Sequence, residues 1–310
     1  MHVFLTGATG FVGSYILKEL INAGHSVRCL MRDTQEPLSI EHESIEKVKG
    51  DITKQKSLVG LFRGCDAVIN LVGIIKENQR AGITFKRMHF EGAKYLIDEA
   101  RASEIDVFIQ MSANGAKAEG VSAYQTSKWQ AEQYMQKAGF KQWTIFRPSV
   151  IFGAPAPGQP EFTSQLAETL IIPFPILPVF GDGSYQMQPV AVEDVAGAFV
   201  QALSTPSANQ QTYCVAGPTA YAYTEILDIL AEGIGISPKP QIKQPLWLVR
   251  PLVHSVGKLG VLPITPDQFE MLIEGNTCDP TAFYRDFDLK RIPFSAENLS
   301  YLQKETKVGT

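Results

Sequence analysis

The stretch Thr6-Gly7-Ala8-Thr9-Gly10-Phe11-Val12-Gly13, close to the start of the chain, decides the fold. The apolar run His2–Thr6 before it predicts a buried strand, and the apolar residues after it recur at helical spacing. Gly7 permits a tight turn, Gly10 lets the backbone approach a ligand, and Gly13 allows close packing of helix on strand. A strand–turn–helix of this kind presents free N–H groups and the positive end of the helix dipole, so it predicts a phosphate-binding turn.

Outward from this turn, short apolar runs alternate with amphipathic stretches through the first half of the chain. The runs predicted to be strands are Val27–Met31, Asp66–Val72, Val107–Met111 and Trp143–Arg147, and the predicted helices are Phe85–Ala102 and Ala123–Lys137. Alternation through short links predicts a parallel sheet covered on both faces. We therefore expect an α/β fold, a Rossmann-type doubly wound parallel sheet with a smaller, mostly C-terminal α-rich substrate lobe, and a dinucleotide on the glycine turn.

The character of the sequence changes after Gly153. Residues 154–187 contain six prolines and predict an irregular segment. Val192–Leu203 is expected to be a helix and Gln211–Ala216 a strand, both returning to the sheet, with proline-broken helices afterwards. The predicted domains are a dinucleotide-binding Rossmann domain (1–153 plus 188–217) and a smaller substrate or partner lobe (154–187 plus 218–310).

Composition excludes several classes of protein. The 28 basic and 32 acidic residues are well mixed, and the net charge of -4 gives no basic face for nucleic acid. The four cysteines (Cys29, Cys65, Cys214 and Cys278) form no C-x-x-C pair, so we expect reduced thiols and no metal site. Because the first strand starts at His2 and no run of 18 uninterrupted apolar residues occurs, we expect a cytoplasmic protein, with a peripheral position at the inner face of the membrane as the alternative.

The spacing G-x-x-G-x-x-G resembles that of the extended and atypical short-chain dehydrogenase/reductases. Three further pieces match in order. Leu30-Met31-Arg32 ends the second strand, Gly50-Asp51-Ile52 resembles the aspartate beside the adenine ring, and Tyr124-Gln125-Thr126-Ser127-Lys128 is a Y-x-x-x-K motif that opens a helix. The resemblance covers about residues 1–217 and implies a nicotinamide dinucleotide as cofactor.

The end of the second strand bears on which dinucleotide is bound. NAD-specific folds usually carry an acidic residue there, which binds the ribose 2′-OH. This chain has Met31 and then Arg32, and a guanidinium can bind a 2′-phosphate and stack on adenine. The alternative is that Arg32 is a solvated loop residue beside Asp33. We expect NADP(H) in preference to NAD(H).

The resemblance also implies catalytic roles. In the family the tyrosine is the general acid or base for hydride transfer at a carbonyl carbon, and the lysine holds the nicotinamide ribose. Carried over, Tyr124 is the acid or base, and the Lys128 ammonium, one helical turn later, favours its phenolate. The family's carbonyl-polarising hydroxyl aligns with Ala113, one residue after Ser112. If this alignment were shifted by one residue, Ser112 would supply the carbonyl-polarising hydroxyl. Asn114 is another possible hydrogen-bond donor to the carbonyl.

Several stretches resemble the NAD(P)-binding accessory subunit of respiratory complex I and its bacterial relatives. They are Val68–Gly73, the helix around Tyr124, Arg147–Gly153, Met187–Ala196 and Val215–Pro218. This resemblance implies an NADPH held tightly for assembly and stability, and it places Arg147-Pro148 near the nicotinamide carboxamide. The candidate dinucleotide-binding residues are Gly7, Thr9, Gly10, Phe11, Val12, Gly13, Arg32, Asp51, Ile52, Leu71, Val72, Gly73, Tyr124, Lys128, Pro148 and Val150.

Pro245–Leu262 is the most unusual segment outside the Rossmann domain. Its basic residues recur every four positions among apolar ones (Arg250, His254 and Lys258). A basic stripe on an apolar helix with Trp247 near its start is typical of a membrane-surface helix. We favour instead a covering helix with a solvated basic edge, because Pro251 interrupts the helix.

Two classes of function follow. The first is a cofactor-holding accessory or assembly protein at a respiratory complex, favoured because the serine position falls at Ala113. The second is an NAD(P)H-dependent oxidoreductase that uses Tyr124 and Lys128 on an apolar carbonyl or quinone-pathway compound. The apolar side chains of residues 171–180 suit such a substrate, although a core contact explains them equally well.

Overall fold

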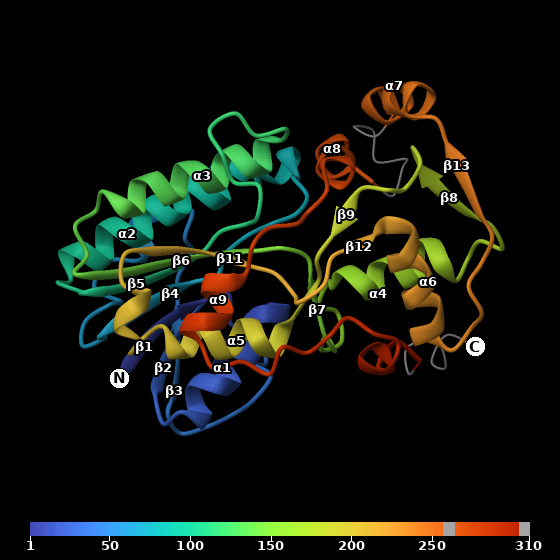
Figure 1. The fold of residues 1–310 in the computed structure, drawn as a ribbon. Coiled ribbons are helices and arrows are strands. Elements are labelled where there is room, and N and C mark those ends of the chain that lie inside the picture. Colours follow the sequence, from blue (N-terminus) through green and yellow to red (C-terminus); the bar gives the residue numbers. More distant parts are fainter. Residues whose placement is uncertain (257–263, 304–310) are drawn as a thin grey trace. The chain divides into compact units, whose positions relative to one another are not determined.

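A computed structural model describes residues 1–256 and 264–303 (Figure 1). The chain divides into two compact units. The sheet unit consists of Met1–Pro148, Glu193–Val215 and Thr281–Leu289, and the second unit of Ser149–Val192, Ala216–Pro280 and Lys290–Thr310.

The sheet unit is built on seven strands, counted over the described ranges, in the order β11-β6-β5-β4-β1-β2-β3. The strands are β1 (His2–Thr6), β2 (Ser26–Met31), β3 (Ile45–Lys49), β4 (Ala67–Asn70), β5 (Val107–Met111), β6 (Gln142–Pro148) and β11 (Gln211–Val215). All neighbouring strands are parallel, which confirms the predicted doubly wound sheet. The strand order reverses between β1 and β4, the place where such sheets bind ligands.

Helices cover both faces of this sheet, as expected (Figure 1). One face carries α2 (Gly92–Ala102) and α3 (Ala123–Gln136), and the other carries α1 (Phe11–Asn22), α5 (Val192–Gln201) and α9 (Thr281–Asp286). The residues before α2, Lys86–Glu91, form a π-helical turn called η3. The predicted helix over Phe85–Ala102 is therefore present, with a π-helical first half.

Alternate residues of the strands point into two apolar cores. Phe4, Val68 and Phe108 belong to the core beneath α2 and α3. On the opposite face Phe146 contacts Phe199 of α5 and Phe283 of α9, with ring centroids 4.5 and 6.4 Å away. Burying each such ring stabilises the fold by about 1.5–3 kcal/mol.

The domain boundaries differ from the predicted ones at both ends of the lobe. Ile151–Phe152 (β7) pairs with Val190–Ala191 (β10) inside the second unit, so residues 149–153 and 188–192 do not belong to the sheet unit. Residues 281–289 belong to it instead, because Phe283 packs on Phe146 and Tyr213 donates a 2.7 Å hydrogen bond to Asp286.

The second unit has more regular structure than its prolines suggested. Its elements are α4 (Phe162–Leu166) with the π-helical turn Ala167–Ile171, β8 (Leu177–Phe180), β9 (Gln186–Met187), β12 (Tyr221–Ala222), α6 (Tyr223–Ile234), β13 (Gln241–Gln244), α7 (Leu246–Val256) and α8 (Pro266–Glu274). The expectation of an irregular 154–187 is wrong in part. Residues 241–244 supply a parallel partner for β8, and residues 221–222 an antiparallel partner for β9.

Helix α7 has one buried face and one exposed face. Val249 and Val253 pack against Phe269 of α8 in a small apolar cluster, as a covering helix should. The predicted basic edge is not simply solvated, because Arg250 and His254 both bind the Glu270 carboxylate, at 2.9 and 2.8 Å. The outward apolar residues are Trp247, Leu248 and Leu252, exposed by 78, 54 and 54%. Lys258 lies outside the described residues.

Within residues 1–256 and 264–303, no helix combines the length and the apolar character needed to cross a membrane.

The cysteines fall into two groups. Cys29 and Cys65 are free, and burial raises the pKa of the Cys29 thiol to about 12. Cys214 and Cys278 are disulfide-bonded, so the expectation of reduced thiols is wrong for these two.

Candidate functional site

The glycine turn joins β1 to α1 at the carboxyl end of the sheet. Gly7 has a φ of +77°, and the Gly10 N–H donates a 3.0 Å hydrogen bond to the Gly7 carbonyl. A Cβ on Gly13 would lie 1.9 Å from the Gly7 oxygen, so only glycine fits there. No side chain caps α1 at its N-terminus, and its first turn, with Phe11 and Val12, carries no acidic residue. This N-terminus therefore suits an anion.

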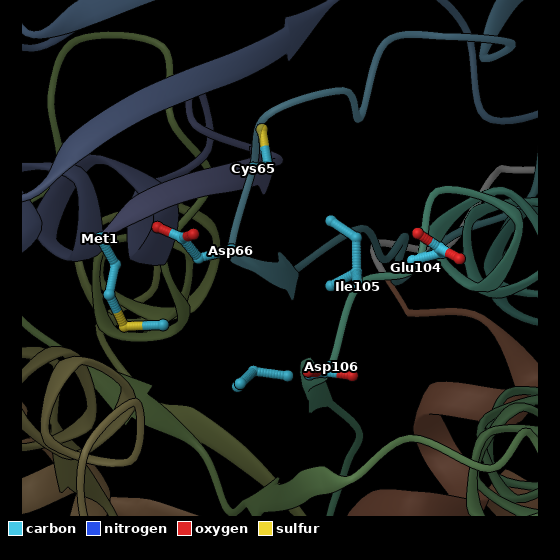
Figure 2. Close-up of a pocket in the computed structure, with 7 residues that line it drawn as sticks. Met1, Cys65, Asp66, Glu104, Ile105 and Asp106 are labelled. Carbon is cyan, nitrogen blue, oxygen red and sulfur yellow. The ribbon is translucent and has the colours of Figure 1, made fainter.

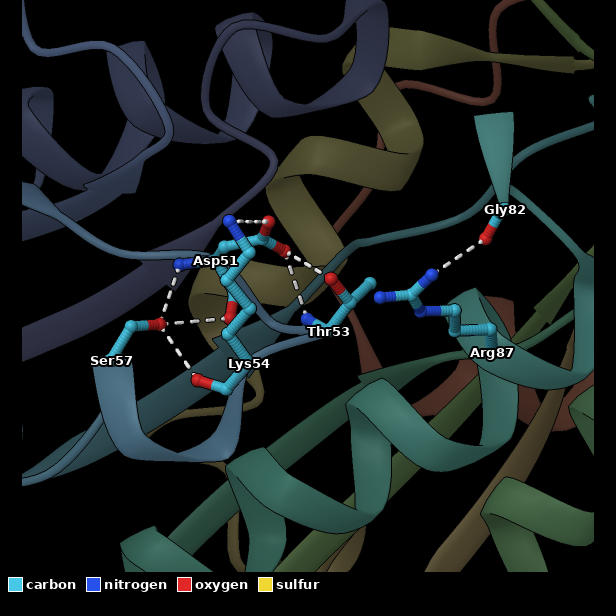
Figure 3. A network of polar contacts seen from close by, with 6 residues as sticks. All are labelled: Asp51, Thr53, Lys54, Ser57, Gly82 and Arg87. Atoms are coloured by element: carbon cyan, nitrogen blue, oxygen red, sulfur yellow. Dashed lines mark hydrogen bonds and ion pairs between the residues drawn. The ribbon is translucent and has the colours of Figure 1, made fainter. Parts of the chain in front are cut away.

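The candidate adenine side lies at the ends of β2 and β3. Arg32 follows β2 and is exposed, while the Asp51 carboxylate accepts hydrogen bonds from the Thr53 N–H (2.9 Å) and hydroxyl (2.8 Å) (Figure 3). Burial raises the pKa of Asp51, but these bonds and the charges of Lys54 and Arg32 bring it below its ordinary value. Arg32 therefore acts electrostatically on Asp51. The Ile52 side chain is buried in the core beneath α2, which leaves only its backbone for a ligand.

The residues that follow β4 connect the glycine turn to the Y-x-x-x-K helix. Leu71 is buried and lies against Gly7, whose Cβ, if present, would be 3.3 Å from that of Leu71. Gly73 lies against Lys128, since a Cβ at Gly73 would be 3.0 Å from the Lys128 Nζ. A side chain at position 73 would therefore crowd the ammonium group.

Tyr124 and Lys128 occupy the first two turns of α3, which begins at an N-cap where the Ser122 hydroxyl accepts the Gln125 N–H. Lys128 is 3% exposed, and burial lowers its pKa to about 8, partly offset by the charge of Glu132. Burial raises the pKa of Tyr124 to about 12. The expected lowering of the tyrosine pKa is therefore not found, because burial raises it and no effect of the Lys128 charge counteracts that. The Tyr124 phenol keeps its proton at neutral pH.

Glu132, one turn beyond Lys128, is a member of this site that the sequence did not single out. It is 0% exposed, and Arg147 of β6 binds both its oxygens, at 2.8 and 2.5 Å. A buried carboxylate that is paired with a cation destabilises the fold far less than an unpaired one. The i, i+4 spacing from Lys128 was the only signal for it in the sequence. Pro148, directly after Arg147, is buried, and Val150 belongs to the second unit.

His89 of the π-helical turn was also missed. Its Nε2 accepts the Ile74 N–H at 2.9 Å, and its Nδ1 lies 3.0 Å from the Ser127 hydroxyl, which itself donates to the Tyr124 carbonyl. These bonds require a neutral ring with its proton on Nδ1. Burial and the Lys128 charge lower the pKa of His89 to about 2, in agreement with a neutral ring. The His89 ring meets the Tyr124 ring edge-on, with centroids 5.1 Å apart.

The position of the carbonyl-polarising hydroxyl lies just beyond β5. The Ser112 and Asn114 N–H groups donate to the Phe146 and Pro148 carbonyls, so this segment continues alongside β6. The Ser112 Oγ is buried and has no hydrogen-bond partner among the described residues. Ala113 has no hydroxyl to offer.

A surface hollow of about 610 Å³ lies elsewhere (Figure 2). Its lining is Met1, Cys65, Asp66, Glu104, Ile105, Asp106 and Val107. These residues precede β1, β4 and β5 or begin β5, so the hollow lies at the amino ends of the strands. Ligands of such sheets bind at the carboxyl ends. The hollow is not part of the candidate site.

Comparisons with known proteins agree with this arrangement. The model of the NAD dependent epimerase/dehydratase family matches residues 3–216. The chain is 32% identical to ceramide reductase of Caulobacter vibrioides over 240 residues, covering 76% of this chain and 72% of that protein. It is 25% identical to the mitochondrial NADH-ubiquinone oxidoreductase 40 kDa subunit of Neurospora crassa over 303 residues (96% and 77%). It is 22% identical to photosystem II assembly factor Ycf39 of Trieres chinensis over 251 residues (81% and 74%).

Solved structures share the fold. MoeE5 in complex with UDP-glucose and NAD superposes with a TM-score of 0.74 at 18% identity, covering 100% of this chain and 99% of that one. UDP-glucose 4-epimerase of Thermotoga maritima gives 0.75 at 17% identity, with coverage of 100% and 99%. Likeness at these identities concerns the fold alone.

The buried Lys128 ammonium generates a stability prediction. Its folded pKa lies below the ordinary value, so burying the charge at neutral pH costs free energy. Lys128→Met should raise the free energy of unfolding at pH 7 by on the order of 2 kcal/mol. The difference should shrink as pH rises from about 8 towards the ordinary lysine pKa, because folded wild type then loses its proton first. Urea unfolding at pH 7 and at about pH 9.5 measures both effects.

Lys94→Met is the matched control. The Lys94 ammonium binds Asp98 at 2.5 Å and the Tyr134 hydroxyl at 3.0 Å, and the Asp98 hydrogen bond raises its pKa. Removing the Lys94 ammonium should lower the free energy of unfolding. If Lys128→Met lowers stability in the same way, the carbonyl contacts of Lys128 outweigh its desolvation and the prediction is wrong.

Proposed function

The chain belongs to the NAD-dependent epimerase/dehydratase family, and we propose that it holds NADP(H) as an accessory or assembly protein linked to a respiratory complex. Two of its relatives are named as a complex subunit and as an assembly factor, which supports this proposal. The 40 kDa subunit aligns with 96% of this chain, so the likeness extends beyond the family's matched region.

The residues of the sheet unit fit a dinucleotide. The uncapped start of α1 would hold the pyrophosphate, Arg32 and Asp51 the adenosine end, and Lys128 the nicotinamide ribose. Lys128 has two carbonyls 3.4 Å away as neighbours, which leaves its donors capacity for ribose hydroxyls. Pro148 would lie near the nicotinamide. A bound cofactor would give or accept a hydride at that ring.

The observation that carries the accessory role is the lack of a hydroxyl at Ala113. An oxidoreductase of this kind needs a donor that polarises the substrate carbonyl as charge develops on its oxygen. Ser112, one residue earlier, has its Oγ buried, at 3% residue exposure. A protein that only holds its cofactor needs no such donor, so this position is free to be alanine.

An oxidoreductase is the second candidate, and the Tyr124–Lys128 pair favours it. A phenol that keeps its proton at neutral pH is a competent general acid toward a carbonyl oxygen. Lys128 would hold the ribose and supply positive charge beside that proton transfer. The relative named ceramide reductase supports an apolar substrate for this candidate.

The preference for NADP(H) rests on Arg32, whose charge acts on the Asp51 carboxylate at the adenine side. Arg32→Ala should weaken NADPH binding and leave NADH binding almost unchanged. A charge-assisted contact of about 1.5–3 kcal/mol corresponds to roughly a 10- to 150-fold loss. Titration calorimetry with both dinucleotides measures it. Equal affinities of the wild type for NADPH and NADH would refute the preference.

Tyr124→Phe separates the accessory protein from the enzyme. The change keeps the ring but removes the hydroxyl, and it leaves Lys128 able to hold the ribose. For an enzyme, turnover should fall at least about 100-fold with little change in cofactor affinity. For an accessory protein, respiratory activity and complex assembly in a complemented deletion strain should stay at wild-type levels, as we expect.

Gly10→Glu is the companion variant. Its carboxylate would occupy the anion site at the start of α1, so it should abolish cofactor binding and impair respiration and assembly under either function. A Tyr124→Phe protein that is folded and binds NADPH but fails to complement would show that the chain is an enzyme.

We propose further that the outward face of α7 contacts a membrane surface. Its exposed Trp247, Leu248 and Leu252 match the apolar and aromatic residues of interfacial helices. Residues 233–266 contain four lysine or arginine residues and no acidic one, in a chain whose net charge is -4, and this suits anionic lipid. A protein partner for the same face is the alternative outcome.

Vesicle binding checks the α7 proposal. The protein should sediment with vesicles that contain anionic lipid at low salt, and less at high salt. Trp247→Ser combined with Leu252→Ser should abolish sedimentation and leave dinucleotide affinity intact. Val59→Ser, which changes an apolar residue 67% exposed in the sheet unit, is the control and should have no effect. Failure of the wild type to sediment at low salt would rule out direct lipid contact.

A further inference from the structure

The position of the Lys128 ammonium depends on two backbone carbonyls. Its Nζ lies 3.4 Å from the carbonyl oxygen of Val72 and 3.4 Å from that of Met111. Val72 follows β4 and Met111 ends β5, so the two carbonyls stand at the carboxyl ends of adjacent strands. Whatever orients these two peptide groups also sets where the ammonium lies.

Asn70, the last residue of β4, holds the peptide group directly before the one that contains the Val72 carbonyl. Its side-chain oxygen accepts the Val72 N–H at 3.3 Å and the Thr6 hydroxyl at 2.7 Å. The Thr6 oxygen in turn accepts the Leu71 N–H at 3.2 Å. Thr6 directly precedes Gly7, so the same amide fixes both the segment that carries the Val72 carbonyl and the entry to the glycine turn.

Gln110 of β5 orients the second carbonyl. Its side-chain nitrogen donates to the Met111 carbonyl at 2.8 Å, and its side-chain oxygen accepts the Asn70 amide at 2.9 Å. Donors and acceptors alternate along the whole chain from Thr6 to Met111, so both amides are held in one orientation. Asn70 and Gln110 are each 2% exposed, so water cannot replace these bonds.

We propose that Asn70 and Gln110 are positioning residues for Lys128, which fix the carbonyls that hold its ammonium at the nicotinamide-ribose end of the site. The inference deepens the proposed dinucleotide binding and rests on it. Stability alone does not account for the pair, since two apolar residues of the same shape would fill this space about as well.

The test compares a whole dinucleotide with its adenine half. Gln110→Met keeps the size of the side chain but frees the Met111 carbonyl. Affinity for NADPH should fall about tenfold, while affinity for adenosine 2′,5′-bisphosphate, which lacks the nicotinamide ribose, should stay within about twofold. Titration calorimetry of the full chain at pH 7 measures both.

Thr144→Val is the matched control. Thr144 of β6 is 0% exposed and donates a 2.8 Å hydrogen bond to the Ala208 carbonyl, so its loss also removes a buried hydrogen bond near β5. It has no link to Lys128 and should change neither affinity. If Gln110→Met fails to fold, the double variant Asn70→Leu with Gln110→Met leaves neither amide unpaired and should show the same selective loss.

The outcomes are distinct. If the wild type binds NADPH, and Gln110→Met and the double variant bind both molecules as the wild type does, the positioning role is wrong and the proposed function stands. Equal losses for both molecules would show a merely structural role and also overturn the inference. A wild type that binds neither molecule overturns the proposed function and this inference together.

Discussion

The close approach of α1 to the glycine turn is the constraint on which the site depends. The first turn of the helix comes so near the Gly7 carbonyl that a Cβ on Gly13 would be 1.9 Å from its oxygen. This contact holds the helix N-terminus over the carboxyl end of β1, directly beside β4 where the strand order reverses. The positive end of the helix dipole therefore lies on the same sheet edge as Lys128, in the arrangement that a long cofactor with an anionic pyrophosphate needs.

The buried Lys128 ammonium, at the carboxyl edge of the sheet, costs folding free energy. Lys128 loses most of its hydration, and its two carbonyl contacts at 3.4 Å are long for hydrogen bonds. Glu132, itself paired with Arg147, supplies the nearby negative charge that partly offsets the cost. We expect the fold to be more stable with an apolar side chain there, so the proposed ribose contact accounts for the lysine.

Burial also affects Tyr124, and the protonation state of its phenol bears on the choice between the two candidate functions. Burial leaves Tyr124 a protonated phenol, held at the start of α3 by the neutral His89 and Ser127. Such a group can serve as an acid if a substrate carbonyl is polarised beside it, and Ala113 offers no hydroxyl for that purpose. The proposed site thus has the residues expected to hold a dinucleotide but no hydroxyl at position 113, so we favour the accessory role.

Local patterns in the sequence determined the glycine turn, the alternation of strands and helices, and the Tyr124–Lys128 spacing, because each depends on residues a few positions apart. Tertiary structure alone decided the remainder. Asn70 meets Gln110, His89 meets Ser127, and the residues of α9 join the sheet, across separations in sequence that no periodicity records. The tyrosine pKa rose where helical spacing alone predicted a fall, because spacing gives the neighbouring charge, whereas burial, which dominated here, exists only after the chain has packed.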